Sequence, residues 1–188
     1  PLVSHTCVVI EDSGIYNEQV TVQRFTNNGS SITIMLDPSL TVHPRVNPPG
    51  ASMAGFLIKN ASVNIVNIDV TPSAAVSYGI LASSPNVTVT SASIDSGGNI
   101  SIAGVALSSE SALSYSSITV QNAHGLRLDG RLITVSDVAA INSAAATFRA
   151  LEIAGVSSNT VTRGFFRNAS AASVNMSGGA AYNTMSWS

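Results

Sequence analysis

The chain has 188 residues, of which 45% are hydrophobic and only 10% are charged, and its formal net charge is −2. This length and apolar content are enough for one domain with a real core, and they exclude a disordered tail. The eight basic residues are scattered, which argues against a nucleic-acid binder, and no run approaches the ~18 consecutive apolar residues of a membrane-spanning helix.

Metal and cofactor sites have little support in the sequence. Cys7 is the only cysteine, so neither an intrachain disulfide nor a thiolate metal cluster is possible. His5, His43 and His124 fall on separate repeats, and no phosphate-cradling Gly loop is present. We therefore expect no cofactor. The chain opens with Pro1 in place of an initiator Met, so we interpret it as a segment of a longer protein.

An internal repeat organises the chain. Pairs of apolar residues, two positions apart, follow eight register marks that are spaced 21 to 25 residues apart. The marks are Cys7, Ser31, Gly55, Gly79, Gly104, Gly125, Ala150 and Ser173. Apolar residues two apart point to one face of a strand, so each repeat is expected to open with a strand whose first and third side chains enter a core.

Further short alternating runs follow in most repeats, for example at 63–65, 87–89 and 118–120, with Gly, Asn, Ser and Pro between them. Several strands per repeat predict an all-β fold, a single parallel β-solenoid of about eight turns that spans residues 1–188. Residues 11–28 depart from the pattern and are expected to form an irregular N-terminal turn. The Pro/Gly-rich segment 43–54 is expected to leave the ladder as a loop insert.

The period and its variability resemble the right-handed parallel β-helix of the pectin-lyase-like superfamily, as in repetitive bacterial surface proteins, adhesins and phage tailspikes. A leucine-rich repeat shares the period, but its Leu-rich consensus does not recur here, and neither does the six-residue period of left-handed hexapeptide helices. The resemblance covers essentially the whole chain, and the right-handed coil is implied by the resemblance and the period.

One local motif supports the resemblance. Gly14-Ile15-Tyr16-Asn17-Glu18 is similar to the Gly-x-Tyr-x-Glu found near the start of pectin methylesterases and other β-helix proteins. In this interpretation Gly14 permits a tight turn, Tyr16 supplies a buried ring and Glu18 ties down loop backbone. The other segments of an active esterase are missing. His124-Gly125 resembles the His-Gly of polygalacturonases, but the accompanying elements are also missing, so His124 is interpreted as a turn residue.

The register also predicts which outward side chains are neighbours on adjacent turns. Arg127 and Glu152 are expected to stack as a cross-strand ion pair, with Asp129 two residues along the same strand. These three are weak catalytic candidates. Catalysis of glycoside hydrolysis would require the two carboxylates to lie roughly 5 to 9.5 Å apart across an open groove.

An apolar stripe is expected on the outside of the first five turns. The stripe consists of Val9, Thr33, Leu57, Leu81 and Ala106, with Met35 beside it. Monomers rarely expose such a strip, so we expect it to meet either the Pro-rich insert or a second molecule.

These features together favour an extracellular or cell-surface structural segment of a large repetitive protein or fibre. Its turns would stack through the edge strands at both ends and pack laterally, so its partners would be copies or neighbouring segments of the same protein. The alternatives are a carbohydrate-binding or polysaccharide-degrading β-helix that recognises glycans, and an adhesin passenger segment. Six Asn-x-Ser/Thr sequons would become meaningful only in a host that glycosylates; they are at Asn28, Asn60, Asn86, Asn99, Asn168 and Asn175.

Overall fold

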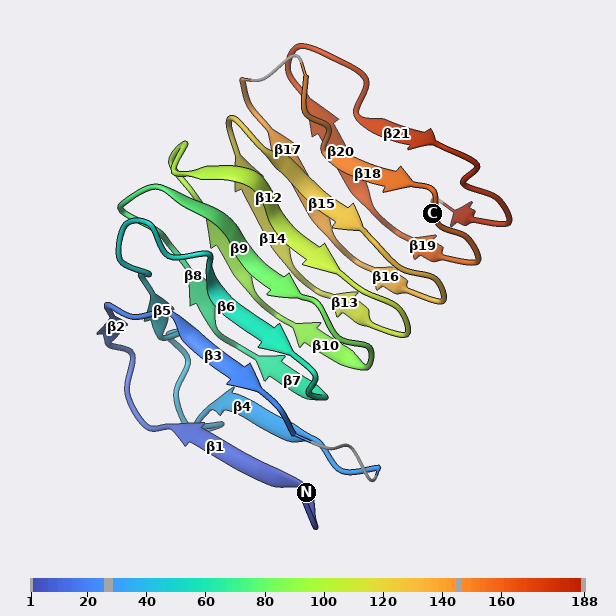
Figure 1. The fold of residues 1–188 in the computed structure, drawn as a ribbon. Coiled ribbons are helices and arrows are strands. Elements are labelled where there is room, and N and C mark those ends of the chain that lie inside the picture. Colours follow the sequence, from blue (N-terminus) through green and yellow to red (C-terminus); the bar gives the residue numbers. More distant parts are fainter. Residues whose placement is uncertain (1, 26–28, 145–146, 187–188) are drawn as a thin grey trace.

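The computed structural model describes residues 2–25, 29–144 and 147–186. The described residues form 22 strands and no helix, and all strand pairs are parallel (Figure 1). Three sheets run along the molecule, and each turn of the chain adds one strand to each of them. The fold is therefore a parallel β-solenoid, as the repeat predicted.

We name the sheets A, B and C in the order in which the chain visits them. Sheet A contains β1 (Thr6–Ile10), β4 (Ile32–Leu36), β7 (Val63–Val66), β10 (Val87–Thr90), β13 (Ala112–Ser114), β16 (Thr134–Ser136), β19 (Thr160–Thr162) and β22 (Thr184–Ser186). Sheet B contains β2 (Ile15–Tyr16), β5 (Arg45–Val46), β8 (Asp69–Val70), β11 (Ser93–Asp95), β14 (Ser117–Val120), β17 (Ala139–Asn142) and β20 (Phe165–Asn168). Sheet C contains β3 (Val20–Gln23), β6 (Ala54–Lys59), β9 (Val76–Ala82), β12 (Ile100–Leu107), β15 (His124–Leu128), β18 (Leu151–Ala154) and β21 (Val174–Ser177).

The described chain makes about seven turns followed by β22, so the expectation of eight turns was one too many. The marks from Gly55 to Ser173 do fall on sheet C, where Phe56 pairs with Ile80 and Ile80 with Val105. Of the first two marks, Cys7 lies in β1 and Ser31 directly precedes β4, both in sheet A. The strand that precedes β6 in sheet C is β3, 36 residues before it by the pairing of Val20 with Phe56.

Two segments that were expected to be irregular belong partly to the coil. Residues 11–28 contain β2 and β3, the second and third strands of the first turn, and 26–28 lie outside the described residues. Within 43–54, Arg45 and Val46 form β5, which pairs with β2 and β8. This segment does not leave the ladder as a whole, because Val46 enters the core and Ala54 begins β6; residues 43–44 and 47–53 lie outside the strands.

The corners of the coil are made by single residues with left-handed backbone. Between sheets A and B these are Asn67, Ser91, Tyr115, Asp137 and Arg163, with φ between 49° and 56°. Between sheets C and A the corresponding residues are Asn60, Asn86, Glu110, Leu132, Ser158 and Tyr182. Backbone N–H groups at these corners continue the ladder, as when Ser91 N donates to Ser114 O at 3.1 Å. The sharp bends therefore cost few backbone hydrogen bonds.

The core is a stack of aliphatic side chains, one layer per turn, in which Ile65, Ile80, Leu107 and Leu126 are fully buried. Glycines at the register marks allow sheets B and C to meet closely: a Cβ atom on Gly79 would lie 2.8 Å from Ile94 Cγ2. Residues that alternate with the core positions point outward, so each sheet has one outer face on which function can reside. In the described chain no helix could cross a membrane.

Candidate functional site

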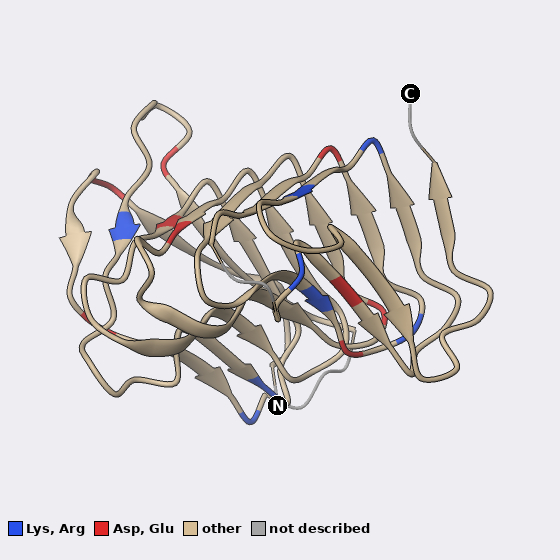
Figure 2. Cartoon of the chain, turned by 90° about the horizontal axis from the view of Figure 1, so that it is seen from above, with Lys and Arg blue, Asp and Glu red and all other residues tan. Residues whose placement is uncertain are grey.

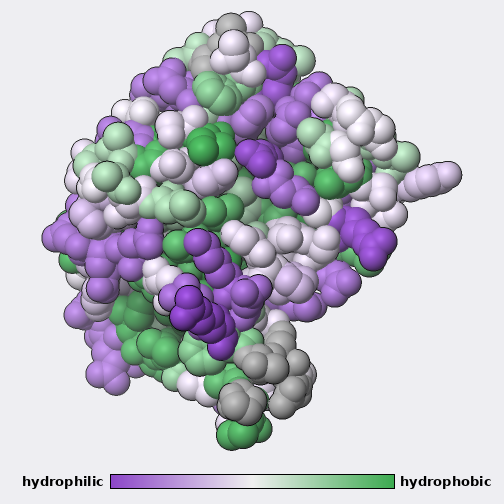
Figure 3. All heavy atoms as spheres, in the orientation of Figure 1, coloured by the Kyte–Doolittle hydropathy of each residue, from purple (hydrophilic) through white to green (hydrophobic). Residues whose placement is uncertain are grey.

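The outer face of sheet C holds most of the residues that the sequence singled out. The row that follows the register marks runs through Thr21, Leu57, Leu81, Ala106, Arg127, Glu152 and Asn175, each paired with the next. It is apolar from Leu57 to Ala106 and charged or polar after that. Hydrophobic side chains lie in small groups between hydrophilic ones on the face seen in Figure 3.

The expected five-turn apolar stripe is not continuous. Val9 pairs with Met35, and Thr33 pairs with Cys7, all on sheet A. Leu57, Leu81 and Ala106 lie on sheet C instead. The first two register marks were assigned to the wrong sheet, and this error joined two separate surfaces into one.

The sheet C part of the stripe is also largely covered by the chain itself. Leu57 is 7% exposed and Ala106 is 1% exposed. Tyr78 on β9 influences the charge of Arg127 on β15, so these two side chains approach each other across β12, to which Ala106 belongs. Leu57 and Ala106 therefore offer little open surface to a second molecule, whereas Leu81 between them is half-buried.

The predicted stacking of Arg127 on Glu152 is confirmed by the register of β15 and β18. The predicted ion pair between them is not what forms. Arg127 Nε donates at 2.6 Å to Oδ1 of Asp129, which directly follows β15. Burial is the largest single influence on the pKa of Arg127 and lowers it, but the hydrogen bond and the charge of Asp129, together with Tyr78, outweigh burial and raise the pKa. Glu152 instead accepts from Asn175 Nδ2 with both carboxylate oxygens, at 2.9 and 3.0 Å.

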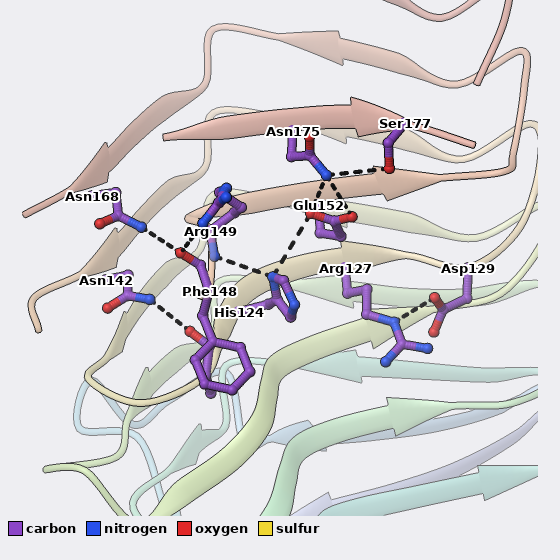
Figure 4. A network of polar contacts seen from close by, with 11 residues as sticks. His124, Arg127, Asp129, Asn142, Phe148, Arg149, Glu152, Asn168, Asn175 and Ser177 are labelled. Atoms are coloured by element: carbon purple, nitrogen blue, oxygen red, sulfur yellow. Dashed lines mark hydrogen bonds and ion pairs between the residues drawn. The ribbon is translucent and has the colours of Figure 1, made fainter. Parts of the chain in front are cut away.

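His124 lies at the centre of the polar network in Figure 4. Its Nδ1 accepts a hydrogen bond from the backbone N–H of Arg149 at 3.2 Å, and its ring meets Phe148 edge-on at 5.2 Å. Because Nδ1 must be unprotonated to accept, the 4.0 Å approach of Glu152 Oε2 is not a hydrogen-bonded ion pair. Burial lowers the pKa of His124 below its ordinary value, and the charge of Glu152 opposes this.

Two stacked asparagines complete this network, and sequence reasoning missed them. Asn142 and Asn168 are partners in neighbouring strands. Asn142 Nδ2 donates to Ala123 O at 2.9 Å, and Asn168 Nδ2 donates to Phe148 O at 2.6 Å. The sequence signal that could have revealed them is that each of two consecutive sheet B strands ends in an Asn. These amides hold backbone carbonyl groups of the segments that lead into sheet C, which is a structural role.

The arrangement of Arg127, Asp129 and Glu152 does not favour acid–base catalysis. Asp129 is held by Arg127, and both oxygens of Glu152 are held by one amide, so each carboxylate is engaged in a charge-stabilising contact. No three His, Cys, Asp or Glu side chains of the described residues come together as a metal site.

A more open hollow lies on the outer face of sheet B. It has a volume of about 470 Å³ and includes His43, Asp69, Tyr115 and Asp137 among its lining residues. His43 Nδ1 lies 3.0 Å from Asp69 Oδ1, and the same oxygen accepts from Ser93 N at 2.9 Å. Sequence reasoning missed this cluster because its members come from three different turns.

The motif at residues 14–18 stabilises the first turn by other contacts than those expected. Asp12 Oδ1 accepts from Gly14 N at 2.8 Å and from the Tyr16 hydroxyl at 2.9 Å. The tie to loop backbone comes from Gln19, not from Glu18: Gln19 Oε1 accepts from Met53 N and Ala54 N at 3.0 and 3.2 Å.

We compared the chain with known protein families, curated proteins and solved structures. The chain matches no family model, and neither a curated protein nor a solved structure is significantly similar to it.

Proposed function

We propose that the chain is an extracellular structural segment whose β-helical turns stack end to end on further turns of the same kind. Its coil would be right-handed, as in the pectin-lyase-like proteins whose repeat it resembles. The role of the segment would be mechanical: the strand ladders would continue from one stacked segment into the next. The chain would lie at the cell surface or in a fibre.

The observation that carries this proposal is the exposure of core positions at both ends. Val8 on β1 is in the same inward column as Ile34 and Ile65, which are buried, but Val8 is 48% exposed. At the other end Met176 on β21 follows Ile153 in the column and is 52% exposed, whereas Ile153 is fully buried. Both end cross-sections thus present apolar side chains beside strand edges, the combination that favours pairing with another strand.

Negative-stain electron microscopy of the purified chain tests the proposal. We expect rods longer than one molecule, and we expect Val8→Lys to shorten them to single units by placing a charge on the N-terminal cross-section. Val42→Lys is the matched control because Val42 is also an exposed valine but lies in a loop outside the column. Single short rods of the unmodified chain at every concentration, or equal effects of the two substitutions, would contradict stacking.

A second candidate function is glycan binding in the hollow on sheet B. The exposed ring of Tyr115 and the carboxylates of Asp69 and Asp137 line the same open surface, and sugars are bound by such combinations of an apolar ring face with polar groups. Retention of the chain by a polysaccharide, lost in Tyr115→Ala, would favour this function over stacking.

A further inference from the structure

The outer face of sheet A differs from the other two faces in composition. On the five strands from β10 to β22 the outward positions form two rows. The first row is Thr88, Ala112, Thr134, Thr160 and Thr184, and the second is Thr90, Ser114, Ser136, Thr162 and Ser186. We call these ten positions the hydroxyl face. Ala112 is the one member without a hydroxyl group, and no member is charged.

The hydroxyl face is regular in two dimensions. The pairing from β10 to β22 runs without a register shift, in contrast to sheet C, where the register shifts between β9 and β12. Side chains within a row are therefore separated by the strand spacing, about 4.8 Å, and the two rows by two residues along a strand, about 6.6 Å. Thr90 Oγ1 and Ser114 Oγ, neighbours in one row, lie 3.3 Å apart.

Strand propensity alone does not explain this composition. Thr is favoured in strands because its branched side chain fits a pleated surface. The outward positions of sheet B on the same turns face the same demand, yet they include Asp95, Ile141, Phe165 and Arg167. The enrichment in hydroxyl groups is thus specific to the outer face of sheet A. Figure 2 shows separately that few residues of the strands are charged.

The chemistry of the hydroxyl face limits what it can bind. Tight protein partners are recognised through buried aromatic and Arg anchors, and the ten positions contain none. Sugars stack on aromatic rings, which are also missing from these positions. What the face offers is a repeating pattern of hydroxyl donors and acceptors with Thr methyl groups between them, which is complementary to a ligand that itself repeats at the same spacing.

We propose that the hydroxyl face binds ice. Ice exposes planes in which water oxygens repeat at spacings close to those of the two rows, and every hydroxyl can replace a lattice water as both donor and acceptor. The methyl groups of the four threonines in the first row and the two in the second order the water around them. A charged side chain would hold its own hydration shell against the lattice. The ten uncharged positions do not compete with ice for water in this way.

The apolar start of sheet A sets the boundary of the ice-binding surface. On β1 and β4 the second row continues as Val9 and Met35, and Cys7 begins the first row, where its Sγ lies 3.7 Å from Met35 Sδ. Thr33 on β4 is the one first-row hydroxyl on these strands, and on β7 Asn64 and Val66 occupy the rows, so the matching lattice begins only after β7.

Ice growth just below the melting point, observed by nanolitre osmometry with the whole chain, tests the proposal. We expect faceted crystals and a gap between melting and growth temperatures, and we expect a fluorescently labelled chain to be retained on an ice surface. Thr134→Lys should abolish both effects because it puts a long charged side chain in the middle of the first row. Thr160→Lys is a second variant at the next position of the row.

Thr119→Lys is the matched control, because Thr119 is an exposed strand threonine on the outer face of sheet B. It should leave ice shaping unchanged, and circular dichroism should show the same β content in all variants. Unshaped ice with the unmodified chain overturns the proposal, as does an equal loss in Thr119→Lys and Thr134→Lys. Dimers in sedimentation velocity that only the sheet A variants disrupt, with unshaped ice, would instead identify a second copy as the occupant.

Discussion

Substitution of Gly104 by Ala should measurably destabilise the solenoid. A Cβ atom at this position would collide with the Cγ2 methyl of Ile118, and it would lie 2.8 Å from the carbonyl oxygen of Gly125 and 3.2 Å from Val120 Cγ1. Overpacking of this kind costs about 1–3 kcal/mol, and the lower unfolded-state entropy of Ala offsets about 0.4–1 kcal/mol of it. We expect a net loss of about 1–2 kcal/mol, or a few degrees in melting temperature for a chain of this length.

Gly50→Ala is the control for this prediction. Gly50 lies in the loop between β5 and β6, and an added Cβ would meet only the Ala74 methyl, at an ordinary 3.4 Å. This variant should be neutral or slightly stabilised. Thermal and urea unfolding followed by far-UV circular dichroism compare the two. Equal midpoints for Gly104→Ala and Gly50→Ala would refute the argument that glycine is needed where sheets B and C meet.

Two further predictions concern titrating groups. The pKa of His124 is lowered in the fold by burial, so its contribution to stability is complete above its ordinary value of 6.5 and is lost as the pH falls below that value; in His124→Gln the melting temperature should therefore fall less on acidification below pH 6.5, and an identical fall would count against this role. The pKa of Asp137 is lowered by its hydrogen bonds with Arg163, at 2.7 and 2.6 Å, so the stabilisation by this pair is present above the ordinary Asp value of 3.8 and is lost as the pH falls through the folded value. Arg163→Gln should return the Asp137 pKa toward 3.8 in an NMR titration of the carboxyl carbon, and an unchanged titration curve would show that another group sets it.

The architecture was predictable from the sequence because the core imposes a strict pattern. Each turn must supply inward side chains at fixed positions, so Phe56, Ile80 and Val105 recur at nearly constant spacing. The register marks at Gly55, Gly79, Gly104 and Gly125 coincide with the close approach of sheets B and C. Parallel pairing follows from this repetition, since equivalent residues of successive turns lie beside one another.

The phase of the first two turns was not predictable from alternation alone. All three sheets alternate inward and outward residues in the same way, so Val8 and Ile10 match the pattern of sheet C although they belong to sheet A. The second turn is also longer: Thr33 pairs with Asn64, 31 residues later, whereas Asn64 pairs with Thr88, only 24 residues later. A constant period therefore assigned strands to the wrong sheet wherever a turn contains extra residues.

The candidate site was predictable at the level of the backbone and not of the side chains. The stacking of Arg127 on Glu152 follows from register. Which partner each charged group contacts depends on side-chain reach and on competitors: Asn175 is the other cross-strand neighbour of Glu152, and Asp129 lies two residues along the chain from Arg127. The clusters around His43 and His124 join residues of several turns, so only the folded chain brings their members together.

The two proposals are physically connected, although each can fail alone. Stacking depends on the inward columns that end at Val8 and Met176, and ice binding depends on outward positions of sheet A. A turn stacked on β22 would extend both hydroxyl rows beyond Thr184 and Ser186 at the same strand spacing. Because adsorption to a lattice sums many weak contacts over a repeating surface, a longer stack would hold ice more firmly than a single segment. An outward row that recurs over several turns is thus more informative about function than any single residue in it.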